Sequence, residues 1–306
     1  MKNQQDNIQD IRNQLSLRKA DKISINSNAL QGHKNLILSS QCDYGVIRNG
    51  GRRGANFGPR SILNSLSSMN ASSCNQLDHK VIRSKTAEIC FDKQQEIDTN
   101  AIEETLSSSL ASNIWHLGGG HDHIYPLLMA LREKHEKICV LNIDAHLDTR
   151  VDPLFHSGTP FRQFSNQYKG EFSLIQMGIH KFANTKNNFS KLQNGKMEVY
   201  TTLQMQKESS NFTNVAQFLE QAISLDPDYQ IVLSLDCDAI ESTTMEGVSA
   251  VNHDGLSLKT VKDIFSWYFS KRQAKSYVGI YEYNPIFDNL SNKGSRAIAS
   301  LMESFL

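Results

Sequence analysis

The chain has 306 residues, and its 32 lysines and arginines are balanced by 32 aspartates and glutamates. The net charge of zero argues against a nucleic-acid binder, and the polar start and the lack of a long apolar run argue against a secretory signal and a membrane span. Five cysteines without a CxxC pair are typical of free thiols in a reducing compartment, so the expected location is the cytoplasm.

The predicted elements begin after a polar arm over residues 1–34, in which one short helix is expected over 10–19. Strands are then predicted over 36–38, 88–91, 113–117, 138–143, 173–178, 231–235 and 277–281. Helices are predicted over 59–66, 102–111, 124–134, 215–225, 258–270 and 291–304. This alternation predicts an α/β fold with a single domain over residues 35–306, in which a doubly wound, mostly parallel sheet lies between two layers of helices.

Histidine and acidic residues gather at the ends of three predicted strands. The clusters are His121-Asp122, which follows three glycines, then Asp144, His146 and Asp148, and finally Asp236 with Asp238. In a doubly wound sheet, ligands bind beyond the carboxyl ends of the strands, where all three clusters fall. So much negative charge in one place needs cations, and hard divalent ions accept both carboxylate and imidazole ligands. The chain is therefore predicted to be a binuclear metal hydrolase.

The spacing within two clusters can aim several side chains at one crevice. Asp144, His146 and Asp148 are two residues apart, so they point the same way if the backbone stays extended as the strand ends. Asp236 and Asp238 follow the same rule. A single Asp-x-His-x-Asp could also be a solvated turn with helix-capping carboxylates. Only the three clusters together favour a metal site.

The glycines at 118–120 allow two interpretations. Glycine permits a sharp turn and a close approach of the backbone, which would bring the His121 imidazole up to the metals. The alternative is a phosphate cradle, but no Lys-Ser or Lys-Thr pair follows the glycines. The first interpretation is the one we adopt.

Three motifs resemble those of the ureohydrolase family, which includes arginase, agmatinase, guanidinobutyrase and formimidoylglutamase. They are Gly-Gly-Gly-His-Asp, Asp-Ala-His-x-Asp and Ser-x-Asp-x-Asp-Ala-Ile, in this order, and the resemblance runs from about residue 35 to the C-terminus. It implies an arginase-like catalytic domain that acts on a small amidine or guanidine and assembles as a homo-oligomer, a trimer or a hexamer.

The resemblance also implies two Mn²⁺ ions per subunit, which suits oxygen-rich sites with some imidazole. One ion would be held by His121, Asp144, Asp148 and Asp236. The other would be held by Asp144, His146, Asp236 and Asp238, with Asp144 and Asp236 bridging the two ions. Cys237 departs from the family, which usually has an aliphatic residue there; its alternating position predicts a small hydrophobe buried in the core.

Segments outside the metal motifs resemble formimidoylglutamase in particular. They are 42–52, Gly54-Ala55, Gly58-Pro59, Thr149-Arg150, 157–163, 177–179, 183–185 and 246–250. N-formimidoyl-L-glutamate, an intermediate of histidine degradation, carries two carboxylates, whereas agmatine carries none. Arg52, Arg150 and Arg162 lie in loops that could rim the site and bind those carboxylates. The alternative for each arginine is a surface or intramolecular salt bridge.

The remaining candidates concern catalysis. Glu282 matches the family glutamate that pairs with the guanidinium or amidinium, and its alternative is an exposed loop acid. Asp148 would bind metal and carry a proton to the departing amine. Asp122 would orient an imidazole or cap the next helix. His156 stands about where arginases have a proton-shuttling histidine, but the local similarity is poor and a satisfied loop histidine is expected instead.

The implied reaction is attack of a metal-bridging hydroxide on the formimidoyl carbon, which releases L-glutamate and formamide. One alternative is another ureohydrolase activity, on agmatine, guanidinobutyrate or arginine, which would release urea. A second is a metal-binding relative without catalytic activity. The related deacetylases are a third, but the tyrosine and histidine pair of their site is not found.

Overall fold

The fold is known from a computed structural model that describes residues 21–28, 30–72, 76–84, 90–210, 212–271 and 273–306. One sheet of nine strands runs through it in the order β1-β3-β2-β4-β9-β8-β5-β6-β7, and every pair of neighbouring strands is parallel. Their bounds are β1 Ser24–Asn26, β2 Asn35–Ser40, β3 Gln76–Arg83, β4 Asn113–Gly118, β5 Lys137–Ile143, β6 Glu171–Ile179, β7 Lys196–Thr201, β8 Gln230–Asp236 and β9 Ser276–Tyr281.

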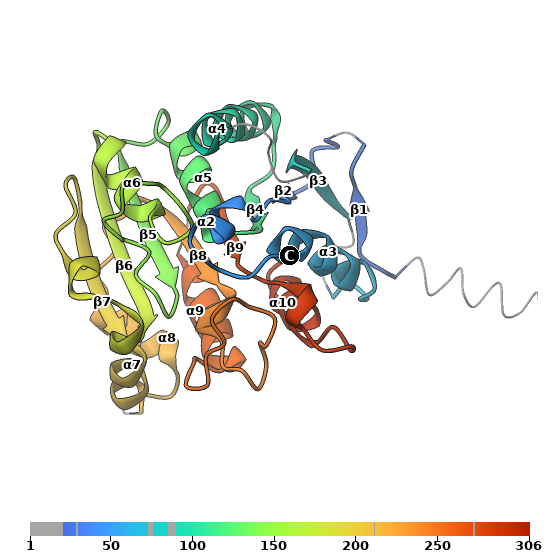
Figure 1. The fold of residues 1–306 in the computed structure, drawn as a ribbon. Coiled ribbons are helices and arrows are strands. Elements are labelled where there is room, and N and C mark those ends of the chain that lie inside the picture. The colour runs from blue at the N-terminus through green and yellow to red at the C-terminus, as the bar shows by residue number, and fades with distance from the viewer. Residues whose placement is uncertain (1–20, 29, 73–75, 85–89, 211, 272) are drawn as a thin grey trace, which may run out of the picture.

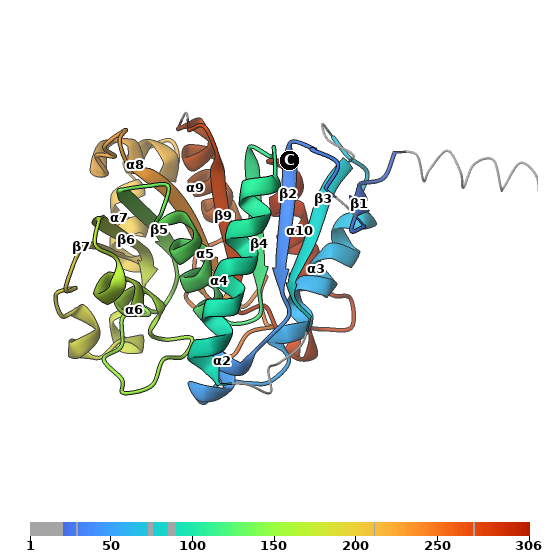
Figure 2. The same cartoon turned by 90° about the horizontal axis from the view of Figure 1, so that it is seen from above.

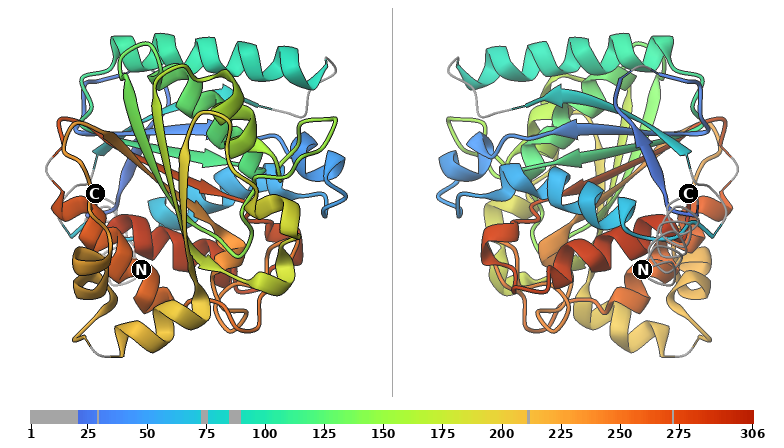
Figure 3. Two further views of the ribbon diagram at one scale, coloured as in Figure 1. Left: turned by 90° about the vertical axis from the view of Figure 1, so that its left-hand side faces the viewer. Right: turned by 90° about the vertical axis from the view of Figure 1, so that its right-hand side faces the viewer.

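Helices cover both faces of this sheet (Figure 1 and Figure 3). One face carries α4 Phe91–Ser108, α5 Ile124–Leu131 and α6 Pro160–Gln167. The other carries α3 Gly58–Ser67, α7 Thr202–Ser209, α8 Val215–Ala222, α9 Leu258–Ser270 and α10 Lys293–Glu303. Each face buries its own apolar core, and the predicted three-layer α/β architecture is confirmed.

The central strands form because their sequences are mostly apolar. Six of the seven residues of β5 and all seven of β8 are buried, as expected for parallel strands with helices on both sides. Strands predicted over 113–117, 138–143, 173–178, 231–235 and 277–281 are confirmed to within two residues. The helix predicted over 258–270 is α9, where Ser257 caps the first turn by accepting the Thr260 N–H at 3.1 Å.

Two predictions between residues 88 and 111 need correction. The strand predicted over 88–91 is wrong at its described residues, because Cys90 is the N-cap of α4 and Phe91 is its first residue; residues 85–89 lie outside the described part. The helix predicted over 102–111 is only the second half of α4. A helix is predicted from apolar residues that recur every three or four positions. The first half of α4 lacks that pattern, because its buried face includes the polar residues Gln94, Gln95, Asp98 and Thr99.

The predicted N-terminal arm has structure at its end. Residues 24–26 form β1, which pairs with β3 at the edge of the sheet, and Ile23 beside it is buried. The helix predicted over 10–19 lies outside the described residues. Strands β3 and β7 were not predicted, because they contain many polar residues and no continuous apolar run. None of the helices in the described part combines the length and apolar character that crossing a bilayer requires.

The strand order positions the predicted site. Strands β4, β9, β8 and β5 are consecutive neighbours at the centre of the sheet. Their carboxyl ends lead into His121, Glu282, Asp236 and Asp144, respectively. In Figure 2 the strands run down the picture, and α2 (Tyr44–Arg48) lies beyond the end of β2 at the bottom of the view. Four segments that are far apart in sequence therefore meet at the carboxyl end of the sheet.

Candidate metal centre and active site

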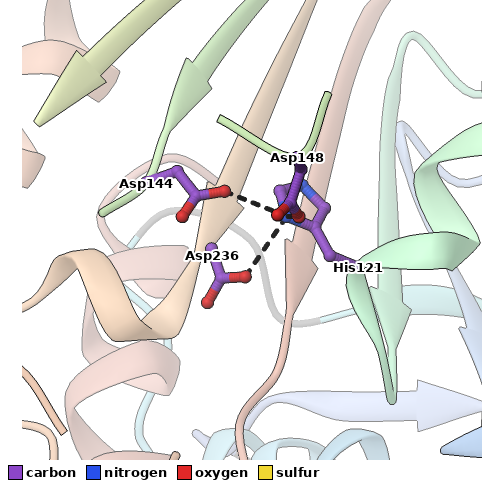
Figure 4. A group of neighbouring side chains, drawn as sticks. All are labelled: His121, Asp144, Asp148 and Asp236. Carbon is purple, nitrogen blue, oxygen red and sulfur yellow. Dashed lines mark ion pairs between the residues drawn. The ribbon is translucent and has the colours of Figure 1, made fainter. Parts of the chain in front are cut away.

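Four of the predicted ligands converge on one point, as Figure 4 shows. Nδ1 of His121 lies 2.9 Å from Asp148 Oδ2 and 3.2 Å from Oδ2 of both Asp144 and Asp236. Ligand atoms of this group all lie within 4.8 Å of one another, a spacing that could hold one metal ion. We call this the His121 group.

A second group lies beside it and shares Asp144. His146 Nδ1 lies 3.0 Å from Asp238 Oδ2 and 3.6 Å from Asp144 Oδ1. The two oxygens of Asp144 thus face different imidazoles, which is the arrangement expected of a bridging carboxylate. Asp236 belongs to the His121 group, and its Oδ1 accepts the Asp238 N–H at 2.9 Å, so its place as a second bridge stays a prediction. The structure brings all six predicted ligands together.

The donor atoms in this cluster fit metal ligands. His121 Nδ1 and Asp238 Oδ1 are buried atoms that make no hydrogen bond of suitable geometry, although carboxylate oxygens lie close to His121 Nδ1. Buried polar atoms are normally satisfied, so these two point to a group that the side chains themselves do not supply. The His121 ring is fixed on its other side, where Nε2 lies 2.8 Å from Ser234 Oγ and the ring stacks on Tyr281 at 5.1 Å. Contacts of this kind, on the side of the ring away from the metal, orient an imidazole ligand.

The electrostatics of the site also favour cations. Burial, followed by the charge of Asp144, raises the pKa of Asp148 to about 6. Burial and the charge of Asp238 raise the pKa of Asp236 well above its ordinary value. The charge of Asp238, against burial, raises the pKa of His146. These buried carboxylates repel one another where little water screens their charges. Bound divalent cations would offset this repulsion, because they would be the largest charges in the site.

Glu282 completes the cluster from β9. It is buried, so the alternative of an exposed loop acid is wrong. Its Oε1 accepts the backbone N–H of His121 at 3.1 Å, and its own N–H donates to Gly119 O at 2.8 Å. Burial raises the pKa of Glu282 to about 8, partly offset by the hydrogen bond from His121. The carboxylate is thereby held next to the His121 group.

The backbone is unusual at two candidate residues. Asp148 and Glu282 have φ angles of 49° and 65°, and they are two of only three non-glycine residues with positive φ in the described part of the chain. Left-handed conformations are uncommon for residues other than glycine and cluster at functional sites. At Gly119 the constraint is space, because an added Cβ would lie 2.0 Å from Cys42 O. The glycines before His121 thus serve close approach rather than a left-handed turn.

A cavity of about 490 Å³ opens onto the cluster. His146, Asp148, Asp236, Asp238 and Glu282 line one part of it, and its walls include Asn49, Arg150, Ser157, Ala183, Thr185, Asn188 and Ser249. A larger groove of about 720 Å³ lies around Lys137 and Glu171, where β5 and β6 begin. It lies far from these carboxylates, so size alone does not locate the site.

The three candidate arginines differ in position. Arg150 lines the cavity, where Nη1 donates to Asn49 Oδ1 at 2.5 Å and Nε lies 2.9 Å from Asp152 Oδ2. Arg162 is not among the lining residues, and its guanidinium donates to Thr149 O at 2.7 Å and to the Ser190 and Lys191 carbonyls. Arg52 is also outside, with its guanidinium 4.8 Å from the centre of the Phe287 ring. Only Arg150 is placed to meet a substrate in the cavity.

Three further predictions have structural outcomes. Cys237 is fully buried in the apolar core, as expected. His156 is a satisfied histidine, with Nε2 2.8 Å from Asp152 Oδ2 and Nδ1 accepting the Gly158 N–H. Asp122 makes no capping hydrogen bond to α5, and its Oδ1 is buried without a partner. Capping is therefore not its role, and orientation of an imidazole stays a prediction.

Sequence reasoning missed the amide side chains around the ligands. Asn142 Nδ2 donates to Asp144 Oδ2 at 3.2 Å and to Gln176 Oε1 at 2.8 Å. Asn142 and Gln176 are each a polar residue inside an apolar strand, shortly before the strand ends. A polar residue near the end of an apolar strand is therefore the sequence feature that could have identified them. Asn184 lies in a loop, where no such feature distinguishes it.

Comparison with known proteins gives a consistent result. The arginase family model matches residues 35–306. Formimidoylglutamases are similar in sequence: that of Cupriavidus pinatubonensis is 29% identical over 281 residues, and that of Staphylococcus aureus 30% over 276, each covering 88% of this chain and 85% of the relative.

Solved structures share the fold. Trypanosoma cruzi formiminoglutamase with Mn²⁺ has a TM-score of 0.74 at 22% identity, covering 91% of this chain and 94% of that one. Bacillus subtilis formimidoylglutamase also has a TM-score of 0.74, at 19% identity, covering 93% and 89%. At such identities the likeness shows the arginase-like fold alone.

Proposed function

The chain belongs to the arginase family of metallohydrolases that act on C–N bonds, and from this premise we propose that it hydrolyses N-formimidoyl-L-glutamate to L-glutamate and formamide. The observation that carries the proposal is the polarity of the cavity. Acidic candidate ligands and Glu282 lie in one part, and Arg150 is the one arginine or lysine among the described residues that line it. A substrate with an amidinium and a carboxylate offers a charge partner to the acidic groups and to Arg150.

The metal groups would hold two Mn²⁺ ions. His121, Asp144, Asp148 and Asp236 would bind one ion, and Asp144, His146 and Asp238 the other. When bound, such ions lower the pKa of a coordinated water towards neutrality and so supply a nucleophile. The carboxylate-rich donor set with two imidazoles suits manganese. Asp236 as a second bridging ligand is part of the same proposal.

Three side chains would handle the substrate. The Glu282 carboxylate, fixed by the His121 N–H, pairs with the planar amidinium and orients its carbon towards the attacking oxygen. Arg150 binds a carboxylate of the glutamate moiety at the cavity wall. Asp148 takes the proton of the attacking water and passes it to the departing amine nitrogen.

The reaction balances with water as the only co-reactant. Water oxygen forms a bond to the formimidoyl carbon, the bond from that carbon to the glutamate nitrogen breaks, and the nitrogen leaves as an amine with the transferred proton. Formamide and L-glutamate are the products. A ureohydrolase acting on a guanidine would release urea by the same steps, so the products distinguish the two activities.

The test is a substrate panel. Protein loaded with Mn²⁺ is incubated with N-formimidoyl-L-glutamate, agmatine, 4-guanidinobutyrate and arginine, and formamide, glutamate and urea are measured. Release of formamide and glutamate from the first substrate alone supports the proposal. Urea release would assign a different ureohydrolase activity, and bound manganese without turnover of any substrate would indicate a non-catalytic relative.

The homo-oligomer, a trimer or a hexamer, also stays a proposal that rests on the resemblance. Light scattering coupled to size-exclusion chromatography measures it directly, because a monomer has a mass of 34.5 kDa.

A further inference from the structure

The segment that carries three candidate ligands has already left the sheet. Strand β5 ends at Ile143, and Asp144, His146 and Asp148 follow it. The backbone bends at Ala145 and His146, where Asp144 Oδ1 accepts the His146 N–H at 2.7 Å. A segment that leaves a sheet loses ladder partners for its N–H and C=O groups, and buried groups of this kind need other partners.

One side chain replaces the missing ladder. Asn184 Oδ1 accepts the Leu147 N–H at 2.9 Å, and Asn184 Nδ2 donates to Ala145 O at 3.1 Å. In a parallel ladder, a residue opposite position 146 would donate to the carbonyl of 145 and accept from the N–H of 147. The Asn184 amide thus takes the place of a peptide group in a neighbouring strand, opposite His146.

Asn184 is itself held in place. Its Nδ2 also donates to His180 O at 2.9 Å, and the His180 N–H donates to the same Ala145 carbonyl at 3.1 Å. Ala183, Thr185 and Asn188, which surround Asn184 in the loop, line the substrate cavity. Asn184 therefore joins the ligand segment to a wall of that cavity.

We infer that Asn184 is a positioning residue, which fixes the backbone between Ala145 and Leu147 so that Asp144, His146 and Asp148 meet the metal ions. The inference rests on the proposed function only in requiring that the site binds metal. It makes no use of the substrate, so it can fail or stand independently of the assignment to N-formimidoyl-L-glutamate.

The test uses two substitutions at Asn184. Asn184→Ala removes the amide and its volume, and Asn184→Leu removes the amide while keeping a similar shape. We expect both to weaken Mn²⁺ binding by about ten- to a hundredfold, the range for groups that orient ligands. We also expect kcat to recover towards the wild-type value when Mn²⁺ is raised to saturation, with KM little changed. Asn187→Ala, an exposed asparagine in the same loop, is the matched control.

Titration calorimetry with Mn²⁺ alone and thermal unfolding of the metal-free proteins separate the possible results. Weakened Mn²⁺ binding in both Asn184 variants, but not in Asn187→Ala, supports the inference. If Asn184→Leu binds Mn²⁺ as the wild type does, or if both variants lower only the metal-free melting temperature, the role is merely structural and the inference is overturned. Wild-type protein that binds two Mn²⁺ but releases no formamide would refute the proposed substrate alone. Wild-type protein that binds no Mn²⁺ would overturn both.

Discussion

Replacing Arg150 tests whether this side chain binds a carboxylate of the substrate. Arg150→Met keeps a long unbranched side chain but removes the charge that faces the cavity. Asn49 and Asp152 hold the wild-type guanidinium in place, so its orientation is set before substrate arrives. A pre-oriented guanidinium loses less entropy on binding a carboxylate. We therefore expect the substitution to raise KM for N-formimidoyl-L-glutamate and to leave bound manganese unchanged.

The size of the effect follows from the exposure of Arg150. A hydrogen bond to a charged group contributes about 1.5–3 kcal/mol. The Arg150 side chain is 44% exposed, so solvent screens the interaction and the lower end of that range applies. A loss of about 1.5 kcal/mol corresponds to roughly a tenfold fall in kcat/KM. Stability should change by less than about 1 kcal/mol, because the Arg150–Asp152 pair is partly exposed.

The assay is steady-state release of glutamate, with Arg52→Met as the matched control. Arg52 is exposed and lies outside the cavity, with its guanidinium over Phe287, so its removal should leave KM unchanged. A tenfold rise in KM for Arg52→Met, with none for Arg150→Met, would refute the assignment. A fall in kcat with no change in KM at Arg150 would indicate that the residue acts on the transition state instead.

Three further predictions follow from the site. Gly119→Ala should lower manganese content and turnover at a stability cost of about 1–3 kcal/mol, because the new Cβ would lie 2.0 Å from Cys42 O; metal analysis showing wild-type manganese would contradict this. Cys237→Ala should cost about 1 kcal/mol in a denaturant titration and leave Mn²⁺ affinity intact, since the thiol is buried in the core; weaker binding would mean that the residue serves the metals. Chelation with EDTA should abolish activity and lower the melting temperature by roughly 5–10 °C relative to protein in Mn²⁺ at 100 times its Kd, with both restored by added Mn²⁺; a melting temperature unaffected by EDTA would count against a bound metal.

Several features of the fold followed from local sequence. The apolar runs that became β5, β8 and β9 are continuous because helices cover both faces of the sheet, and continuous runs are easy to recognise. Edge strand β7 and the first half of α4 were not predicted, because polar residues interrupt their apolar patterns. Where a strand or helix buries polar groups or meets solvent on one side, its composition no longer reports its conformation.

Within the site, the sequence by itself determined which residues stand at strand ends and with what spacing. Alternation along an extended chain predicted a common direction for Asp144, His146 and Asp148. The side chains do converge, but on a backbone that bends at Ala145 and His146 and has a φ of 49° at Asp148, so local turns and not alternation bring them together. Only the tertiary structure decided that β9, the last strand, inserts between β4 and β8 and brings Glu282 to His121. It also decided that Arg150, not Arg162, lines the cavity, and that Asn184 supports the ligand segment. Strand order and loop packing depend on contacts between residues far apart in the chain, which spacing along the sequence does not encode.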